Sequence, residues 1–186
     1  FLLCLLIFPL SIGVFDNVLG KISVSAIWIS TLFSNLLALE GMYKDDYEDG
    51  TLDMFVVNDK YLELDIIAKV LSHWILSNLP VVIIAPLLCI VLGLDASTSY
   101  VLFISLLIGT PTMSLVGSIA AALTISLKKN KILISIVVLP MYIPILIFGT
   151  SAVNNSFFDM IYQSEIIMMT IIFLIFLIVA PIACSR

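Results

Sequence analysis

Apolar residues occur along the chain in six long runs that short polar stretches separate. The runs cover about residues 1–14, 22–39, 70–92, 100–127, 132–153 and 166–184. A helix needs about 20 apolar residues to cross the hydrocarbon core of a bilayer. The pattern therefore predicts an all-α membrane protein with six transmembrane helices. Because the chain begins at Phe1 within the first run, we expect further residues before it.

Composition excludes most functions that need a soluble fold. The 186 residues are 62% hydrophobic and only 11% charged, whereas soluble domains carry about 25% charged residues. Polar side chains are too few to cover a compact globule, which argues against a soluble enzyme, a nucleic-acid-binding protein and a disordered tail. We expect residues 1–186 to form a single transmembrane domain.

One polar stretch is too acidic to lie in lipid. Residues 40–65 contain nine of the thirteen acidic side chains. A central Asp costs a membrane helix about 2.5–3.5 kcal/mol, so nine carboxylates would cost on the order of 20 kcal/mol or more. This segment is therefore predicted to be an aqueous loop between the second and third spans.

Basic residues predict the orientation of the six spans. The acidic loop, the 128–131 turn and the C-terminus fall on one side of the membrane. That side holds seven of the eight basic residues, and the other side holds only Lys21. Because cytoplasmic loops are enriched in Lys and Arg, the acidic loop is expected in the cytoplasm or its equivalent.

The acidic loop has a helical pattern of its own. Placed on a helix, residues 42–54 separate into an aromatic face (Tyr43, Tyr47, Gly50 and Met54) and an acidic face (Asp45, Asp46, Asp49 and Asp53). Leu52 and the Asp49–Gly50 pair weaken this pattern. One interpretation is a solvated loop whose acids keep it out of lipid. The other is an amphipathic helix that docks on a cytoplasmic partner.

His73 is the only histidine, and Trp74 follows it near the start of the third span. As a haem or metal ligand His73 has no second His or Cys/Met pattern to complete a site. The alternative is an interfacial residue that is hydrogen-bonded to a neighbouring helix, with Trp74 as an interface anchor. Cys4, Cys89 and Cys184 lie in apolar runs and are interpreted as small buried hydrophobes.

Proline and glycine predict breaks in the spans. Each proline removes a backbone hydrogen bond, and the freed carbonyls either line a cavity, as in transporters, or belong to simple packing kinks. Small residues with helical spacing predict close helix contact at Ser114, Gly117, Ser118 and Ala121. The expected breaks are at Pro80 and Pro86, at Gly109 and Pro111, and at Pro140 and Pro144.

Catalytic motifs are missing from the sequence. It contains no phosphate-binding loop, no H-E-x-x-H and no Ser/His/Asp arrangement beyond the single His. We therefore expect a non-catalytic membrane subunit that depends on a cytoplasmic partner and binds no metal.

Several short motifs, in their order and spacing, resemble the CcmB family, the haem exporter protein B family of cytochrome c maturation. They are Phe8-Pro9-Leu10-Ser11-Ile12-Gly13, Leu37-Ala38-Leu39-Glu40, Asp45-Asp46, Asp49-Gly50-Thr51-Leu52-Asp53, Ala68-Lys69-Val70, His73-Trp74, Leu79-Pro80, Gly109-Thr110-Pro111, Leu139-Pro140 and Ile143-Pro144. Two departures are Gly41, where the family often has a basic residue, and Asn58-Asp59-Lys60, where it has a proline-rich turn.

The resemblance implies a type-2 ABC permease fold, with an amphipathic helix before the first span and a coupling helix between the second and third. The implied partners are the ATPase subunit CcmA, which binds ATP, the haem-handling protein CcmC, the small protein CcmD and the haem chaperone CcmE. Lipid surrounds the spans, and no nucleic acid is expected. The implied location is the bacterial inner membrane, with the mitochondrial inner membrane as the alternative.

Two mechanisms and one rival function remain open at this point. ATP hydrolysis in the partner would drive either haem export through this subunit or release of the haem-loaded chaperone. The lack of an evident haem ligand beyond His73 favours release. The rival function is a passive membrane scaffold for the haem-handling complex. The residues expected to contact the ATPase are Glu40, Asp45, Asp46, Asp49, Gly50 and Asp53.

Overall fold

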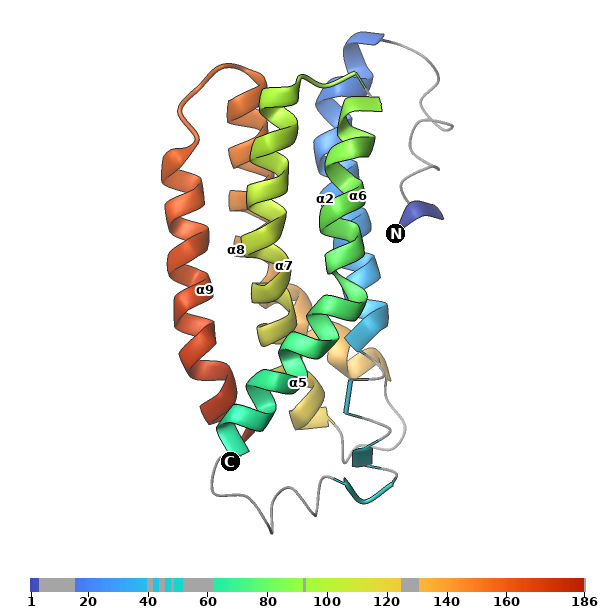
Figure 1. Ribbon diagram of the computed structural model, residues 1–186, viewed down its shortest axis with the longest axis vertical. Helices are drawn as coiled ribbons and strands as arrows, with labels where there is room; N and C mark the ends of the chain where they lie inside the picture. Colours follow the sequence, from blue (N-terminus) through green and yellow to red (C-terminus); the bar gives the residue numbers. More distant parts are fainter. Residues whose placement is uncertain are drawn as a thin grey trace.

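The computed structural model is a bundle of long helices (Figure 1). It describes residues 1–3, 16–39, 42–43, 46–47, 49–51, 62–91, 93–124 and 131–185, with the backbone alone described at 16–21 and 131–133. The helices are α2 (Asp16–Leu39), α5 (Leu62–Ser77), α6 (Leu79–Val91), α7 (Ala96–Thr124), α8 (Lys131–Phe157) and α9 (Gln163–Cys184). Over these residues the fold is all-α, as the apolar runs predict.

Five stretches of the described chain are long and apolar enough to cross a membrane. They are Ile22–Leu39, Leu62–Val91, Ala96–Thr124, Ile134–Phe157 and Gln163–Cys184. Each corresponds to one of the last five apolar runs, so these five spans are confirmed by length and composition. The first expected run falls mainly on residues 4–15, outside the described residues. The six-span count therefore stays a prediction.

Two helix boundaries differ from the sequence-based prediction. α2 begins at Asp16, where a polar turn was expected, and α5 begins at Leu62, inside the expected 40–65 loop. Acidic residues stand in the first turn of α5, at Glu63 and Asp65. Negative side chains at a helix N-terminus interact favourably with the helix dipole, so acidity there extends the helix instead of ending it.

α7 is the central helix of the bundle. Two-thirds of its most apolar window is buried (67%), against 17% for α9. α7 contacts α2, α5, α6, α8 and α9. The small residues expected to make close contacts, Ser114, Gly117, Ser118 and Ala121, are all buried in it. Small side chains let neighbouring backbones approach, which explains why this span occupies the centre and α9 the lipid-facing outside.

α2 packs through two large side chains that fit against glycines. The fully buried Trp28 ring covers Gly109 of α7, where an added Cβ would lie 2.7 Å from Trp28 Cη2. The same ring lies directly against Gly149 of α8. Leu39 covers Gly117 of α7 in the same way. Glycine at these positions is therefore required by close packing.

The prolines do not all break their helices. The third span bends at Asn78, between α5 and α6, and α5 turns away from the bundle axis there (Figure 1). Pro80 accounts for this bend, because its ring clashes with the carbonyl four residues earlier, at Leu76.

The other expected breaks are corrected by the structure. α6 is continuous through Pro86, α7 through Gly109 and Pro111, and α8 through Pro140 and Pro144. A proline removes one hydrogen bond from the ladder, and packing against neighbouring helices holds the remainder of the helix together. Gly109 has a packing role, since Trp28 covers it.

Candidate functional site

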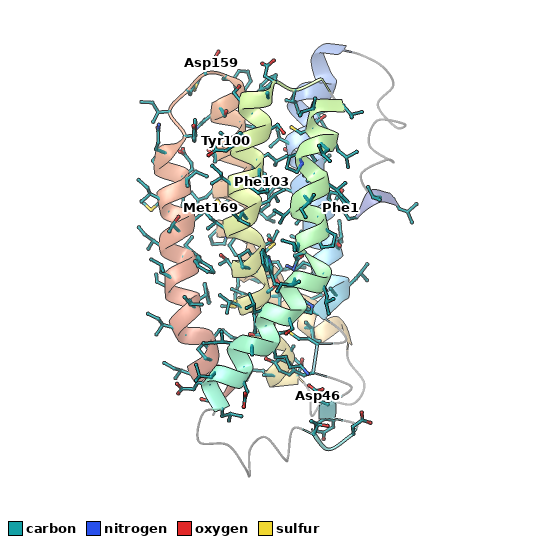
Figure 2. The ribbon with its side chains drawn as sticks, viewed as in Figure 1. Phe1, Asp46, Tyr100, Phe103, Asp159 and Met169 are labelled. Carbon is teal, nitrogen blue, oxygen red and sulfur yellow. The ribbon has the colours of Figure 1, made fainter. Side chains whose placement is uncertain are left out.

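The first candidate site is the contact between the acidic loop and α5. The Asp46 carboxylate forms an ion pair with the Lys69 ammonium group, and Lys69 Nζ also lies 5.6 Å from the centre of the Tyr43 ring. Asp46 is 24% exposed and Lys69 is 30% exposed, so both charges are partly withdrawn from water. Figure 2 places Asp46 at the end of the bundle opposite Asp159. The ion pair fastens the loop to the start of the third span.

Tyr43 extends this contact to two more helices. Its side chain is only 7% exposed, and its phenol lies near Ser118 of α7 and Cys184 of α9. Burial raises the pKa of the Tyr43 phenol well above its ordinary value, and the nearby Cys184 raises it further. Ser118 Oγ and Cys184 Sγ are 3.8 Å apart. The neutral phenol therefore forms a wedge against the ends of α7 and α9.

Among the described residues of the acidic loop (42–43, 46–47 and 49–51), the helical conformation is interrupted at Gly50. The Tyr47 N–H donates to the Tyr43 carbonyl at 3.0 Å, which gives one helical turn. Gly50 then has φ +73°, a left-handed conformation that ends a right-handed helix. Tyr43 is buried whereas Tyr47 is 42% exposed, so the two aromatic residues do not share one buried face.

Gly50→Ala is expected to weaken the fold of the loop by about 1 kcal/mol, because a Cβ disfavours positive φ. Nothing lies within 4 Å of the position where the Cβ would be, so the effect comes from the backbone alone. Gly50→Asn should cost less, since Asn tolerates this conformation. Limited proteolysis of the loop in each variant measures the difference. Equal protection of both variants and the native protein would contradict the prediction.

The other residues expected to contact the ATPase divide into two groups. Asp49 lies at the exposed surface of the loop, next to Gly50. Glu40, Asp45 and Asp53 lie outside the described residues. Asp46 points towards α5 and pairs with Lys69, which is a contact within the chain.

The second candidate site is a group of polar side chains around the middle of α7, here named the central polar cluster. Three hydrogen bonds join it: Trp74 Nε1 donates to Thr110 Oγ1 at 2.9 Å, Asn78 Nδ2 to Ser114 Oγ at 3.0 Å, and Tyr142 Oη to the Met113 carbonyl at 2.6 Å. They connect the third span and α8 to α7. The Trp74 indole therefore donates to a neighbouring helix near the middle of α7, and its role as an interface anchor stays a prediction.

His73 lies beside the central polar cluster. Both of its ring nitrogens are buried without a hydrogen-bond partner among the described residues, and the Ala38 backbone of α2 lies near the ring. In the part of the chain that is described, no three His, Cys, Asp or Glu residues gather as metal ligands. The Ala38 backbone belongs to a neighbouring helix, as the hydrogen-bonded interpretation of His73 requires, and this interpretation stays a prediction.

Asn35, Asn78 and Tyr142 were missed by the sequence analysis. Each carries an amide or phenol group within an apolar run, and each has a fully buried side chain. The signal that would have found them is such a group inside a span, because polar groups there face other helices and mark polar paths.

The Trp74–Thr110 hydrogen bond is expected to contribute about 0.6 kcal/mol to stability, the average for polar contacts between membrane helices. Trp74→Phe, Thr110→Val and the double variant form a thermodynamic cycle that isolates this term. Thermal unfolding in detergent measures it. Strictly additive effects would mean that the bond contributes nothing.

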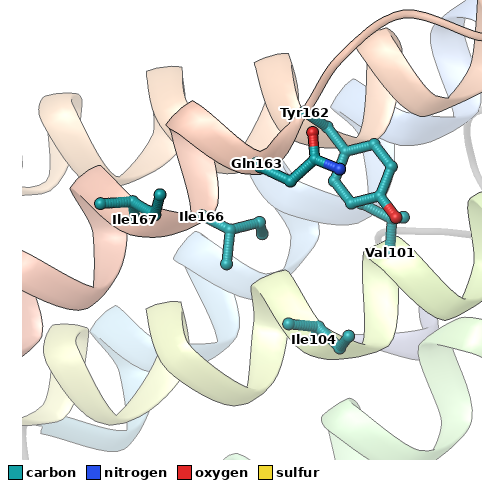
Figure 3. Close-up of a pocket in the computed structure, with 6 residues that line it drawn as sticks. All are labelled: Val101, Ile104, Tyr162, Gln163, Ile166 and Ile167. Atoms are coloured by element: carbon teal, nitrogen blue, oxygen red, sulfur yellow. The ribbon is translucent and has the colours of Figure 1, made fainter.

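An apolar pocket of about 240 Å³ lies away from both sites. It opens between α7 and α9 near the start of both helices (Figure 3). Its lining residues are Val101, Ile104, Tyr162, Gln163, Ile166 and Ile167. The aliphatic lining agrees with the lipid-facing position of α9.

Comparisons with known proteins give one consistent result. The family model described as "CcmB protein" matches residues 1–186. "Heme exporter protein B" of Escherichia coli K12 is 42% identical over 156 residues, which cover 84% of this chain and 71% of the relative. The protein of the same name from Pseudomonas aeruginosa is 41% identical over 156 residues (84% and 70%). That from Paracoccus denitrificans is 34% identical over 185 residues (100% and 85%).

Proposed function

Because the chain belongs to the CcmB protein family, we propose that it is the permease subunit of an ABC complex for cytochrome c maturation. The ATPase partner, corresponding to CcmA, binds and hydrolyses ATP, and this subunit converts that energy into movement of its spans. The complex lies in the bacterial inner membrane, with the acidic loop in the cytoplasm.

The observation that carries this proposal is the attachment of the acidic loop to three helices. The Asp46–Lys69 ion pair holds the loop on α5, and Tyr43 wedges it against α7 and α9 near Ser118 and Cys184. A partner that pushes on the exposed side of the loop therefore displaces these helices together. Packed helices move as rigid units between discrete arrangements. A small displacement of the loop can therefore change the positions of whole helices in the membrane.

The movement serves haem handling through CcmC, CcmD and the chaperone CcmE. Its output is release of the haem-loaded chaperone or export of haem itself, and haem is cargo in either case. His73 is the only histidine of the sequence that could ligate haem, which favours release over export.

The direct test is capture of partners with the full-length tagged protein in mild detergent. We expect an ATPase with a phosphate-binding loop to co-purify. Asp49→Asn should weaken its capture, because Asp49 is exposed on the loop. Asp95→Asn is the matched control: it removes one exposed carboxylate between α6 and α7, at the other end of the bundle. Equal capture by both variants would locate the docking surface elsewhere.

A passive scaffold is the outcome that would replace coupling. If ATPase capture and cytochrome c maturation both persist when the loop is detached from α5, movement of the loop is not required. Recovery of the protein alone, under conditions where other membrane complexes survive, would argue against the permease function itself.

A further inference from the structure

Asn35 of α2 is a fully buried side chain whose amide nitrogen and oxygen both lack a partner among the described residues. Asn78 is also fully buried, and its Oδ1 has no partner although its Nδ2 donates to Ser114. An unpaired polar group in an apolar interior is strongly unfavourable, so three such atoms in one region require an explanation.

Helix geometry places the two amides at the same level of the bundle. Trp28, Asn35 and Leu39 lie within roughly 40° of one another around α2, so they share one face. Trp28 and Leu39 of that face contact Gly109 and Gly117 of α7. Since α2 and α7 run in the same direction (Figure 1), Asn35 lies between these contacts, roughly five residues past Gly109, at the level of Ser114. Asn78 binds Ser114 from the third span.

Further polar groups lie between Asn35 and the acidic loop. The Ala38 backbone follows Asn35 by about one turn of α2, and the imidazole of His73 lies near it, with both ring nitrogens buried. Polar groups therefore continue from the middle of the bundle along the contact between α2 and the third span, down to the end that carries Tyr43.

The chemistry of these atoms matches water. Asn35 Nδ2 requires an acceptor, whereas Asn35 Oδ1 and Asn78 Oδ1 require donors. One small neutral molecule that donates twice and accepts twice serves all three, and buried water makes two to four such bonds (typically about three). We propose that Asn35, Asn78 and His73 line an internal water-binding site, which opens to the cytoplasmic side where α2 separates from the third span. This goes beyond the coupling function and does not depend on it, because occupancy is measured without ATP.

The test is the reactivity of cysteines introduced into the full-length protein in membrane vesicles, with Cys4, Cys89 and Cys184 replaced by alanine. Asn35→Cys is treated with a small charged methanethiosulfonate. The cysteine thiolate attacks the sulfenyl sulfur of the reagent, forms a mixed disulfide and releases methanesulfinate. Because the thiolate forms only where water reaches the sulfur, modification should be about tenfold or more faster than at dry positions.

Two control variants on α2 give the modification rate of a cysteine that water does not reach. Leu37→Cys lies two residues away and faces outward (70% exposed), and Ile27→Cys is fully buried among apolar residues. Faster modification of Asn35→Cys than of both controls supports the site. A rate equal to theirs would overturn it.

Asn35→Leu provides a second test of the hydration of this site, and this test does not require the cysteine variant to fold. If the site is hydrated, leucine displaces the water and leaves Asn78 Oδ1 unpaired, so the apparent Tm should fall by about 3 °C. If the site is dry, leucine removes an unpaired amide and the Tm should rise. A rise would overturn the proposal.

Discussion

Replacing Asp46 by lysine is expected to detach the acidic loop from the third span and to abolish cytochrome c maturation. The Asp46 carboxylate pairs with Lys69, and both side chains are less than a third exposed. Asp46→Lys exchanges this attraction for repulsion between two partly desolvated ammonium groups. The expected loss in loop attachment is about 2 kcal/mol or more, above the range for exposed ion pairs. Maturation is measured as covalently bound haem in c-type cytochromes, and loop attachment by limited proteolysis.

A double variant in which the two charges are exchanged distinguishes a contact within the chain from a contact with the ATPase. Asp46→Lys with Lys69→Asp restores an ion pair of the opposite sense, so maturation should recover in the double variant. Lys69→Asp alone should fail like Asp46→Lys. If the double variant is as inactive as the single variants, Asp46 acts directly on the partner, and the attachment to α5 is not what carries coupling.

Gly149→Ala is expected to reduce the amount of folded protein sharply. The Trp28 ring lies directly against Gly149 and is fully buried. An indole ring cannot bend away, so an added methyl group must push α2 from α8. Overpacking of this kind costs about 1–3 kcal/mol, and glycine positions at membrane helix contacts are especially sensitive because close approach is what holds the helices together. Yield after detergent extraction and thermal stability measure the effect.

Two matched variants identify Trp28 as the cause. Gly117→Ala meets the end of the Leu39 side chain, which is flexible, so it should cost less than Gly149→Ala. Trp28→Leu in the Gly149→Ala background removes the obstacle and should restore part of the lost stability. Strict additivity of Trp28→Leu and Gly149→Ala would mean that the two residues are not in contact.

The sequence alone determined the class of fold, because transfer of side chains into lipid is a local property. Runs of apolar residues predicted five spans that the structure contains. The nine carboxylates of residues 40–65 identified the one long polar connection. Pro80 was one of several prolines at which the sequence predicts a break, and the bend at Asn78 confirms that one.

Only the tertiary structure decided what the individual polar and small residues do. Gly109 appeared to be a helix break, and it is a contact for Trp28, which is distant in sequence. Asp46 is expected from the sequence to contact the ATPase, and in the structure it pairs with Lys69 of α5. Asn35 and Asn78 are polar residues within apolar runs, and only the structure shows which helices face them. The physical reason is the same in each case: the role of a glycine, a charge or an amide depends on which helix faces it, and helix packing brings together positions whose separation in the chain has no fixed period.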